Sequence, residues 1–524
     1  MKMSIFEFFN QASAQRAMRI ILWLGVAYLA ARLIAYHWLI ISNPYPAEYR
    51  EGAMLMTTDL LLKGGNPFAL ANQPQYTNVY GILYHWLILP FAKVFGPTLF
   101  VHRMAAGMFI GAACLSLFMV MRFMGIEVLS SIIGVLFFYS HLIFPSTTTP
   151  LAGPHSLGVF LFILSIYIPL IFRFSYVSLA MSVILALLGF YAKIYYFLGA
   201  PYLTLYLFLF VSKKKSLLYG ITSLAGLIIS IVIMNHYSDC YFNNTVFNNV
   251  TNAGNFLNHC HKQFIAYFQY YQGFYYVVAA SVVYLLVSLR AKRGNGVGII
   301  SFDFLNLHKP LLSFNFDLSL FCLICSTAII YFKMGQHGGS WLAYLFQLIS
   351  PFLIVVVFNL LKKLKAYTII ALLFLVMTLS VVVRLHFPLK FEDGGSEWQK
   401  IEALISVHQN IFNTPAIVPL LIEQNKNVVD SGSSEYFGAG TIRRTGFGIN
   451  FKPDIRIAEK YYEYFNKIND DIHNKRYDLM IITRNWAPLV SGDIVHSYDY
   501  VAAVPVAMPF TRQNWELTIW KPKP

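Results

Sequence analysis

Two stretches between the first and second apolar runs decide how this chain is arranged: PYPAEYREGAMLMTTDLLLKGGNPF at residues 44–68 and VYGILYHWLILPFAKVF at residues 79–95. In the first, two prolines hold the entry extended, a helix fits from about Glu48 to Lys63, and a pair of glycines ends it. Glu48 and Glu51 are three residues apart, so a helix over both would present them on one face. The stretch therefore predicts a short helix that gathers carboxylates.

Apolar runs dominate the chain on both sides of this loop. Of its 524 residues 57% are hydrophobic and 12% are charged, and the mean hydropathy is +0.56, which excludes a soluble protein. The excess of 39 Lys and Arg over 24 Asp and Glu then has a membrane explanation, and no nucleic-acid partner is predicted. A bilayer core of about 30 Å predicts about eleven transmembrane helices, at residues 18–41, 100–121, 128–145, 155–172, 176–191, 194–211, 217–235, 273–290, 317–333, 341–361 and 366–384.

The basic residues orient these runs. With a cytoplasmic N-terminus, clusters such as Lys213–Lys215 and Lys362–Lys365 all fall on the cytoplasmic side, as the positive-inside rule requires. If residues 79–95 also crossed, every later loop would change sides, so this stretch is predicted to be an interfacial or re-entrant helix. The loop at residues 42–99 and the tail from residue 385 then lie outside the cytoplasm.

The tail has the composition of a soluble domain. Helix-like runs at residues 397–412 and 456–472 alternate with short apolar strands, which predicts a small α/β fold. The expected strands are residues 427–431, 477–483, 500–508 and 515–520. The sequence therefore predicts a polytopic α-helical membrane domain at residues 1–384 and an extracytoplasmic α/β domain at residues 385–524.

Acidic residues are scarce in the membrane part. Only eight of the 24 lie in the first 384 residues, and Glu48, Glu51 and Asp59 of the outer loop are three of them. A solvated acidic helix face with Arg50 as counter-ion is the plain alternative. The scarcity favours function, because a partly buried Glu can accept a proton from a hydroxyl.

Cations and histidines gather at the same outer level of the predicted spans. Cations near lipid are costly and usually have a partner, although snorkelling to the headgroups is the alternative. Carboxylates that face several cations predict a site for a phosphate-bearing lipid and a hydroxyl nucleophile. The residues concerned are Arg32, His37, Arg103, His155, Lys193 and His337.

The sequence carries no motif typical of a metal site or a nucleotide-binding site. There is no set of metal ligands at the usual spacing and no glycine-rich phosphate loop, so neither a metal nor a cofactor is predicted. Cys322 and Cys325 form a CxxC inside an apolar run and are interpreted as buried thiols. Cys240 and Cys260 bracket an outer loop, and whether they pair stays open.

The outer loop resembles that of the GT-C glycosyltransferases, polytopic enzymes that use polyprenyl-phosphate sugars, such as aminoarabinose transferases of lipid A and protein O-mannosyltransferases. The family's order is an acid near the end of the first span, a helix ending in Gly and Pro, a Tyr-rich stretch and an Arg. Here these are the acid pair, LLKGGNPF, YGILYHWLILPFAKVFG and VHRMAAG. Weaker similarity lies in GPHSLGVFLFILSI, FYAKIYYFLGAP and GQHGGSWLAYLFQLISP, and the tail resembles C-terminal domains of bacterial members.

The resemblance implies transfer of a sugar, with inversion, from a polyprenyl-phosphate donor to a hydroxyl of a lipid, glycan or protein. We expect a multi-pass protein of the bacterial inner membrane with its active site and tail on the periplasmic side, while two Asn-x-Thr matches at Asn243 and Asn249 leave a eukaryotic lumenal setting open. Glu51 or its neighbour Glu48 matches the catalytic base. The residues matched to the donor phosphate are Lys193, Arg103 and Arg32, and those matched to the substrate cleft are Asp59, Tyr80, Tyr84, His155 and His337.

One departure from the family pattern concerns Gly153-Pro154-His155. Many relatives have Arg-Pro-Asp there, so no second acid can be assigned and acceptor recognition is expected to differ.

Three rival classes predict other patterns. A transporter or flippase for a lipid-linked or anionic substrate predicts ionisable residues near the bilayer midplane and inverted repeats, and neither is evident in the sequence. A ligase or polymerase that uses diphosphate-linked donors would be expected to carry Arg-rich outer loops. A structural or sensory membrane protein differs by releasing no polyprenyl phosphate from a lipid-linked sugar.

Overall fold

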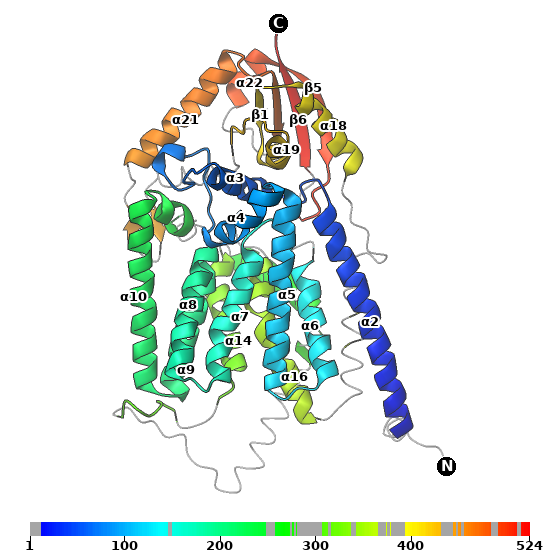
Figure 1. The fold of residues 1–524 in the computed structure, drawn as a ribbon, viewed down its shortest axis with the longest axis vertical. Helices are drawn as coiled ribbons and strands as arrows, with labels where there is room; N and C mark the ends of the chain where they lie inside the picture. The colour runs from blue at the N-terminus through cyan, green and yellow to red at the C-terminus, as the bar shows by residue number, and fades with distance from the viewer. Residues whose placement is uncertain are drawn as a thin grey trace.

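A computed structural model shows a long helical bundle with an α/β domain stacked on one end (Figure 1). Helices α3 (Glu51–Leu62) and α4 (Leu83–Phe95) lie between the two parts, and α2 (Ala12–Ser42) runs along the side of the bundle. The structure describes residues 12–144, 149–247, 257–272, 275–276, 279, 306–312, 316–336, 342–364, 374, 378, 394–430, 444–446, 449–451, 455–483, 491–510 and 515–524.

The bundle is built from apolar helices. Among the described residues, four are long and apolar enough to cross a membrane, at Arg16–Ser42, Leu99–Phe123, Lys213–Tyr237 and Leu318–Gln336. Each predicted crossing with described residues coincides with helical structure, whereas residues 273–290 and 366–384 lie almost wholly outside the described part. The bundle helices are α2 (Ala12–Ser42), α5 (Leu99–Phe123), α6 (Val128–Leu142), α7 (His155–Ile171), α8 (Tyr176–Ala192), α9 (Gly199–Phe210), α10 (Lys213–Tyr237), α12 (Leu257–Tyr270), α14 (Leu318–Phe332), α15 (Ala343–Leu348) and α16 (Ser350–Leu364).

The stretch at residues 79–95 forms α4, a helix of 13 residues from Leu83 to Phe95. At 1.5 Å per residue it spans roughly 20 Å, less than the bilayer core of about 30 Å. Its outward face carries exposed Trp86, Phe91 and Phe95. These features agree with the predicted interfacial helix.

Helix α3 runs from Glu51 to Leu62 and begins three residues later than predicted. The reason is that the Glu51 carboxylate accepts hydrogen bonds from the backbone N–H groups of Ala47 (2.8 Å) and Glu48 (3.3 Å), which turns the chain before the helix starts. Gly64, at φ 76°, follows its end, as the glycine pair predicted. Because Glu48 precedes the helix, the prediction that Glu48 and Glu51 share one helical face is wrong.

The C-terminal part contains a four-stranded sheet in the order β1-β4-β6-β5, with β1 parallel to β4 and the other pairs antiparallel. The two described strands β2 and β3 pair separately. Its elements are α18 (Gly395–Val407), β1 (Ile411–Asn413), η5 (Pro415–Ile417), α19 (Val418–Glu423), β2 (Arg444–Gly446), β3 (Ile449–Phe451), α21 (Ile455–His473), β4 (Leu479–Thr483), α22 (Ser491–Ser497), β5 (Tyr498–Val506) and β6 (Trp515–Pro522).

Two details of the predicted tail are wrong. The helix expected at residues 397–412 ends at Val407, and its last apolar residues belong to the sheet as β1. The strand expected at residues 427–431 is absent over the described residues 427–430. There the Asn413 side chain accepts from Val429 N (2.7 Å) and donates to the Asp430 carbonyl (2.8 Å), so a side chain takes the hydrogen bonds that a neighbouring strand would make.

The C-terminal domain packs directly on the outer loop. The ring of Tyr45 stacks on Trp398, and that of Tyr49 stacks on Trp515 with centroids 5.2 Å apart. Helix α3 also packs closely against the C-terminal domain, since a Cβ added to Gly52 would lie 2.7 Å from the Pro415 carbonyl oxygen. The loop that carries the candidate acids thus shares a core with the domain.

Glu423, at the end of α19, should make the stability of this region depend on pH. Burial and the nearby Glu402 carboxylate raise the pKa of Glu423 to about 7 from its ordinary 4.5. Between these values the folded protein holds a proton that the unfolded chain has lost, so stability falls as pH rises from 4.5 to about 7. Because the Glu423 side chain is itself exposed and solvent screens its charge, we expect Glu423→Gln to raise the free energy of unfolding by no more than about 1 kcal/mol at about pH 8 and to change it little at about pH 4. Thermal unfolding at both pH values, with exposed Glu459→Gln as control, measures this; equal shifts at both would contradict it.

Candidate active site

A buried cluster of charges lies where the outer loop meets the turn after α8. Glu48 is only 2% exposed, and its carboxylate accepts from Arg50 Nε at 2.6 Å and from Arg50 N at 2.8 Å. Lys193 is 4% exposed, and its ammonium is within electrostatic reach of both Arg50 and Glu48. Residues far apart in the sequence therefore form one group of two cations and a carboxylate.

Three tyrosine rings surround the Lys193 ammonium. Its Nζ lies 4.6 Å from the ring centre of Tyr80, 4.8 Å from that of Tyr195 and 5.4 Å from that of Tyr344. The rings come from the outer loop, the turn after α8 and α15. Lys193 itself ends α8 in an extended conformation, which turns its side chain out of the helix register. Cation–π attraction fixes the position of the ammonium without neutralising it.

Polar side chains extend the cluster beyond the three tyrosine rings around Lys193, which form the lysine cage. The Tyr195 hydroxyl lies 3.1 Å from His155 Nδ1, and the Tyr80 ring meets the His155 ring edge-on at 5.6 Å. The Tyr196 hydroxyl donates to Gln347 Oε1 at 2.6 Å. The structure thus brings together four residues predicted for the site: Glu48, Tyr80, His155 and Lys193.

Burial sets the electrostatics of the cluster. It raises the pKa of the Glu48 carboxyl above its usual range, although Arg50 acts in the opposite direction. Burial and then the charge of Arg50 lower the pKa of Lys193 well below the usual value, with Glu48 opposing them. A carboxylate with a raised pKa is a better base, and a lysine lacking a full counter-charge attracts an anion.

Glu51 and Arg103 form a separate, fully buried ion pair. Arg103 Nε and one terminal nitrogen donate to the two Glu51 oxygens, each at 2.8 Å. The remaining guanidinium N–H groups donate to the carbonyls of Ile40, Asn43 and Tyr45. All five donors of Arg103 are therefore used, which leaves none for the donor phosphate that the sequence assigned to it.

The Glu51 carboxylate is equally occupied. Besides Arg103 and the two N–H groups that start α3, it accepts from Ala152 N at 3.2 Å. The pair thus joins α5, the end of α2, the start of α3 and the turn before α7. Its geometry is that of a structural anchor for the outer loop.

The other predicted residues lie elsewhere. The Tyr84 hydroxyl donates to the His102 carbonyl (2.9 Å) and accepts from Gly153 N (3.1 Å), so it ties α4 to its neighbours. Asp59 pairs with Lys63 at 2.6 Å. Arg32 lies within α2, roughly 15 Å along the helix from its end at Ser42. His337 is outside the described residues.

Sequence reasoning missed part of the cluster. Arg50 was interpreted only as a counter-ion, and Tyr195 and Tyr344 were not singled out. The one local signal was the pair of tyrosines that follows Lys193 and Ile194 in KIYYF. Helix α15 lies in the stretch GQHGGSWLAYLFQLISP, whose similarity to the family did not single out Tyr344.

The described residues form neither a cluster of metal ligands nor a disulfide. No three His, Cys, Asp or Glu side chains gather there as a metal ion would need. Cys240 and Cys260 form no disulfide, which answers the question that their spacing left open.

Comparisons with known proteins identify the fold. No protein-family model and no curated protein matches the chain. A solved structure does, the crystal structure of ArnT from Cupriavidus metallidurans bound to undecaprenyl phosphate. The two align over 94% of this chain and 97% of that chain, with a TM-score of 0.53 and 10% sequence identity. The expectation from the sequence is confirmed at the level of the fold: this chain has the same fold as the ArnT structure.

Proposed function

We propose that the chain is a membrane glycosyltransferase that moves a sugar from a polyprenyl-phosphate donor to a hydroxyl acceptor. The observation that carries this proposal is the buried carboxylate of Glu48 beside the cations Arg50 and Lys193 in a GT-C fold. Two cations and one carboxylate suit an anionic group such as a phosphate. The solved ArnT structure supports the same class of ligand, because it holds undecaprenyl phosphate.

The proposed reaction uses one base and no general acid. The acceptor hydroxyl loses its proton to Glu48, its oxygen bonds to the anomeric carbon, and the bond from that carbon to the phosphate oxygen breaks with inversion. The leaving polyprenyl phosphate needs no proton, since the second pKa of such a phosphate is about 6. Lys193 and Arg50 stabilise the charge that develops on the leaving oxygen.

Glu48 is the better base of the two candidates. The carboxylate of Glu51 is already occupied by Arg103 and by three backbone N–H groups. The hydrogen bonds to the Glu48 carboxylate come from Arg50 alone. Glu48 can therefore accept a proton while the Glu51–Arg103 ion pair that anchors the loop stays intact.

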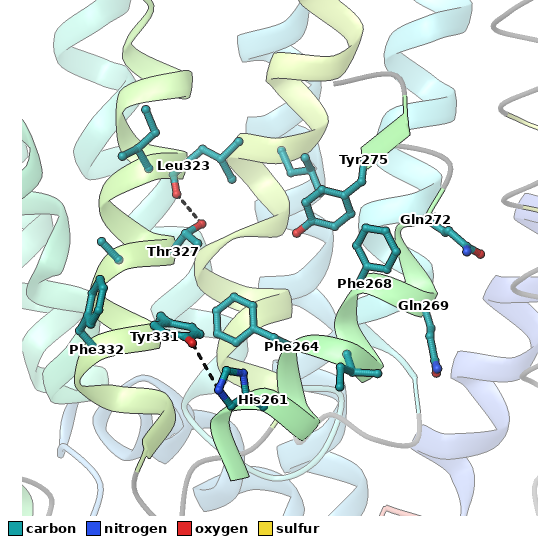
Figure 2. Close-up of a pocket in the computed structure, with 14 residues that line it drawn as sticks. His261, Phe264, Phe268, Gln269, Gln272, Tyr275, Leu323, Thr327, Tyr331 and Phe332 are labelled. Carbon is teal, nitrogen blue, oxygen red and sulfur yellow. Dashed lines mark hydrogen bonds between the residues drawn. The ribbon is translucent and has the colours of Figure 1, made fainter. Parts of the chain in front are cut away.

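A groove between α12 and α14 suits the polyprenyl chain. It has a volume of about 950 Å³, and Figure 2 shows its aromatic wall of Phe264, Phe268 and Tyr275. The His261 ring lies 3.4 Å from the Tyr331 hydroxyl within it. Helix α15, which carries Tyr344 of the lysine cage, packs against both α12 and α14. This supports a donor whose phosphate meets Lys193 and whose chain enters the groove.

We place the site on the periplasmic face of a bacterial inner membrane. The lysines at the start of α10 lie at the opposite end of the bundle from the C-terminal domain (Figure 1). The positive-inside rule assigns that basic end to the cytoplasm. The acceptor, whether lipid, glycan or protein, then approaches from the side of the C-terminal domain.

Release of polyprenyl phosphate tests the function. Purified full-length protein is given a panel of radiolabelled polyprenyl-phosphate sugars together with periplasmic-face acceptors. We expect turnover with at least one donor, and we expect Lys193→Met to lower kcat/KM by roughly 10²- to 10³-fold, because a buried cation at the leaving oxygen is lost. The exposed Lys93→Met serves as control. No release with any donor, or full activity of a folded Lys193→Met variant, would refute the proposal.

A further inference from the structure

A second groove, of about 620 Å³, lies between α9 and α10. The helices meet closely at its floor, where a Cβ added to Gly220 would lie 3.0 Å from Thr204 Cγ2 and where the Ser216 hydroxyl donates to the Thr204 carbonyl at 2.7 Å. Its walls are apolar side chains that stand out from the two helices. They include Leu205, Phe208, Leu217, Ile221 and Leu224.

One end of this groove is basic. Lys213, which is 4% exposed and donates to the Asn306 carbonyl at 3.1 Å, lines the groove at the start of α10, and the exposed Lys214 follows it. The segment at residues 306–312 crosses this end, where the Lys214 N–H donates to the Leu307 carbonyl at 2.8 Å. This segment adds the exposed Lys309. The N-terminal end of α10 contributes a partial positive charge as well.

The described carboxylates at this end have other partners. Glu127, before α6, lies 3.8 Å from Arg19. Asp317 caps α14 through Leu320 N at 2.9 Å and accepts from Asn359 at 3.3 Å. The surface around the lysines at this end of the groove is therefore mainly positive, and an anionic ligand would neutralise it.

We infer that this groove binds one anionic phospholipid of the phosphatidylglycerol type, with an acyl chain along α9 and α10 and the phosphate beside Lys213 and Lys214. An apolar channel between two membrane helices that ends in basic residues on the cytoplasmic side combines both parts of such a ligand. A free phosphate would leave the apolar walls unexplained, and a neutral lipid would leave the lysines unexplained. The site lies at the other end of the bundle from Glu48 and is independent of the proposed reaction.

Lipid binding to the full-length protein tests the inference. Retention of phosphatidylglycerol and of phosphatidylcholine is measured by native mass spectrometry after delipidation and titration. We expect tighter retention of phosphatidylglycerol, lost at least tenfold in Ile221→Trp, which fills the groove with apolar volume. Ile229→Trp is the matched control, since Ile229 lies on the same helix with the same 58% exposure but outside the groove.

Charge recognition is tested separately. Lys214→Gln should weaken phosphatidylglycerol binding about fivefold, the effect of roughly 1 kcal/mol per basic residue near the lipid surface, and should leave phosphatidylcholine unchanged. Lys93→Gln, at the opposite end of the bundle, should alter neither. Equal retention of the two lipids by the wild-type protein, or equal losses in Ile221→Trp and Ile229→Trp, would overturn the inference.

Discussion

Replacement of Glu48 by Gln is expected to lower the rate of sugar transfer by about 10³-fold, because the proposed general base is lost and such a base contributes roughly 10²- to 10⁴-fold. Gln keeps the size of the side chain, and its carbonyl oxygen can still accept the hydrogen bond from Arg50 Nε. The variant should therefore fold and bind the lipid-linked donor. Single-turnover transfer and donor binding, measured on the same purified sample, separate the two effects.

Glu51→Gln is the matched comparison, and its expected failure is of another kind. It weakens a buried ion pair and should reduce the yield and thermal stability of the folded protein. A folded, inactive Glu51→Gln beside an active Glu48→Gln would return the role of base to Glu51.

The pH profile gives a further measure of the Glu48 assignment. Burial raises the pKa of Glu48, so the base is lost to protonation at a higher pH than for an ordinary Glu. kcat/KM should therefore fall as pH drops through this raised pKa and should level off above it. The acid limb should be absent in Glu48→Gln.

Replacement of Arg103 by Met is expected to destabilise the membrane domain by roughly 3 to 5 kcal/mol, the range found when one partner of a buried ion pair is removed. The change leaves the Glu51 carboxylate buried without its counter-ion and strips donors from the carbonyls of Ile40, Asn43 and Tyr45. Arg103→Lys should rescue little, since one ammonium cannot reproduce a five-donor fork. Folded yield and thermal unfolding in detergent measure the loss.

Arg122→Met on the same helix is the control for this prediction. Arg122 is exposed and donates to the Ile126 carbonyl, so its replacement should cost about 1 kcal/mol, well below the loss expected for Arg103. A well-folded but inactive Arg103→Met would contradict the structural role and would restore Arg103 as a ligand of the donor phosphate.

The sequence alone determined the features that depend on local composition. Apolar runs marked helices of the bundle, and the end of α3 followed from a glycine pair that permits a left-handed turn. The basic clusters predicted that residues 79–95 stay out of the span count, and these residues form the short helix α4. Such signals are readable because hydrophobicity and backbone preference act within a few residues of one another.

Only the tertiary structure decided which charges meet. Glu48 and Glu51 look alike in the sequence, yet one is bonded within its own turn while the other is held by Arg103 from a helix 52 residues away. The cage around Lys193 likewise draws Tyr80 and Tyr344 from distant segments. Ion pairs and ring contacts act over a few ångströms in space, so their partners are fixed by how the helices pack and not by spacing along the chain.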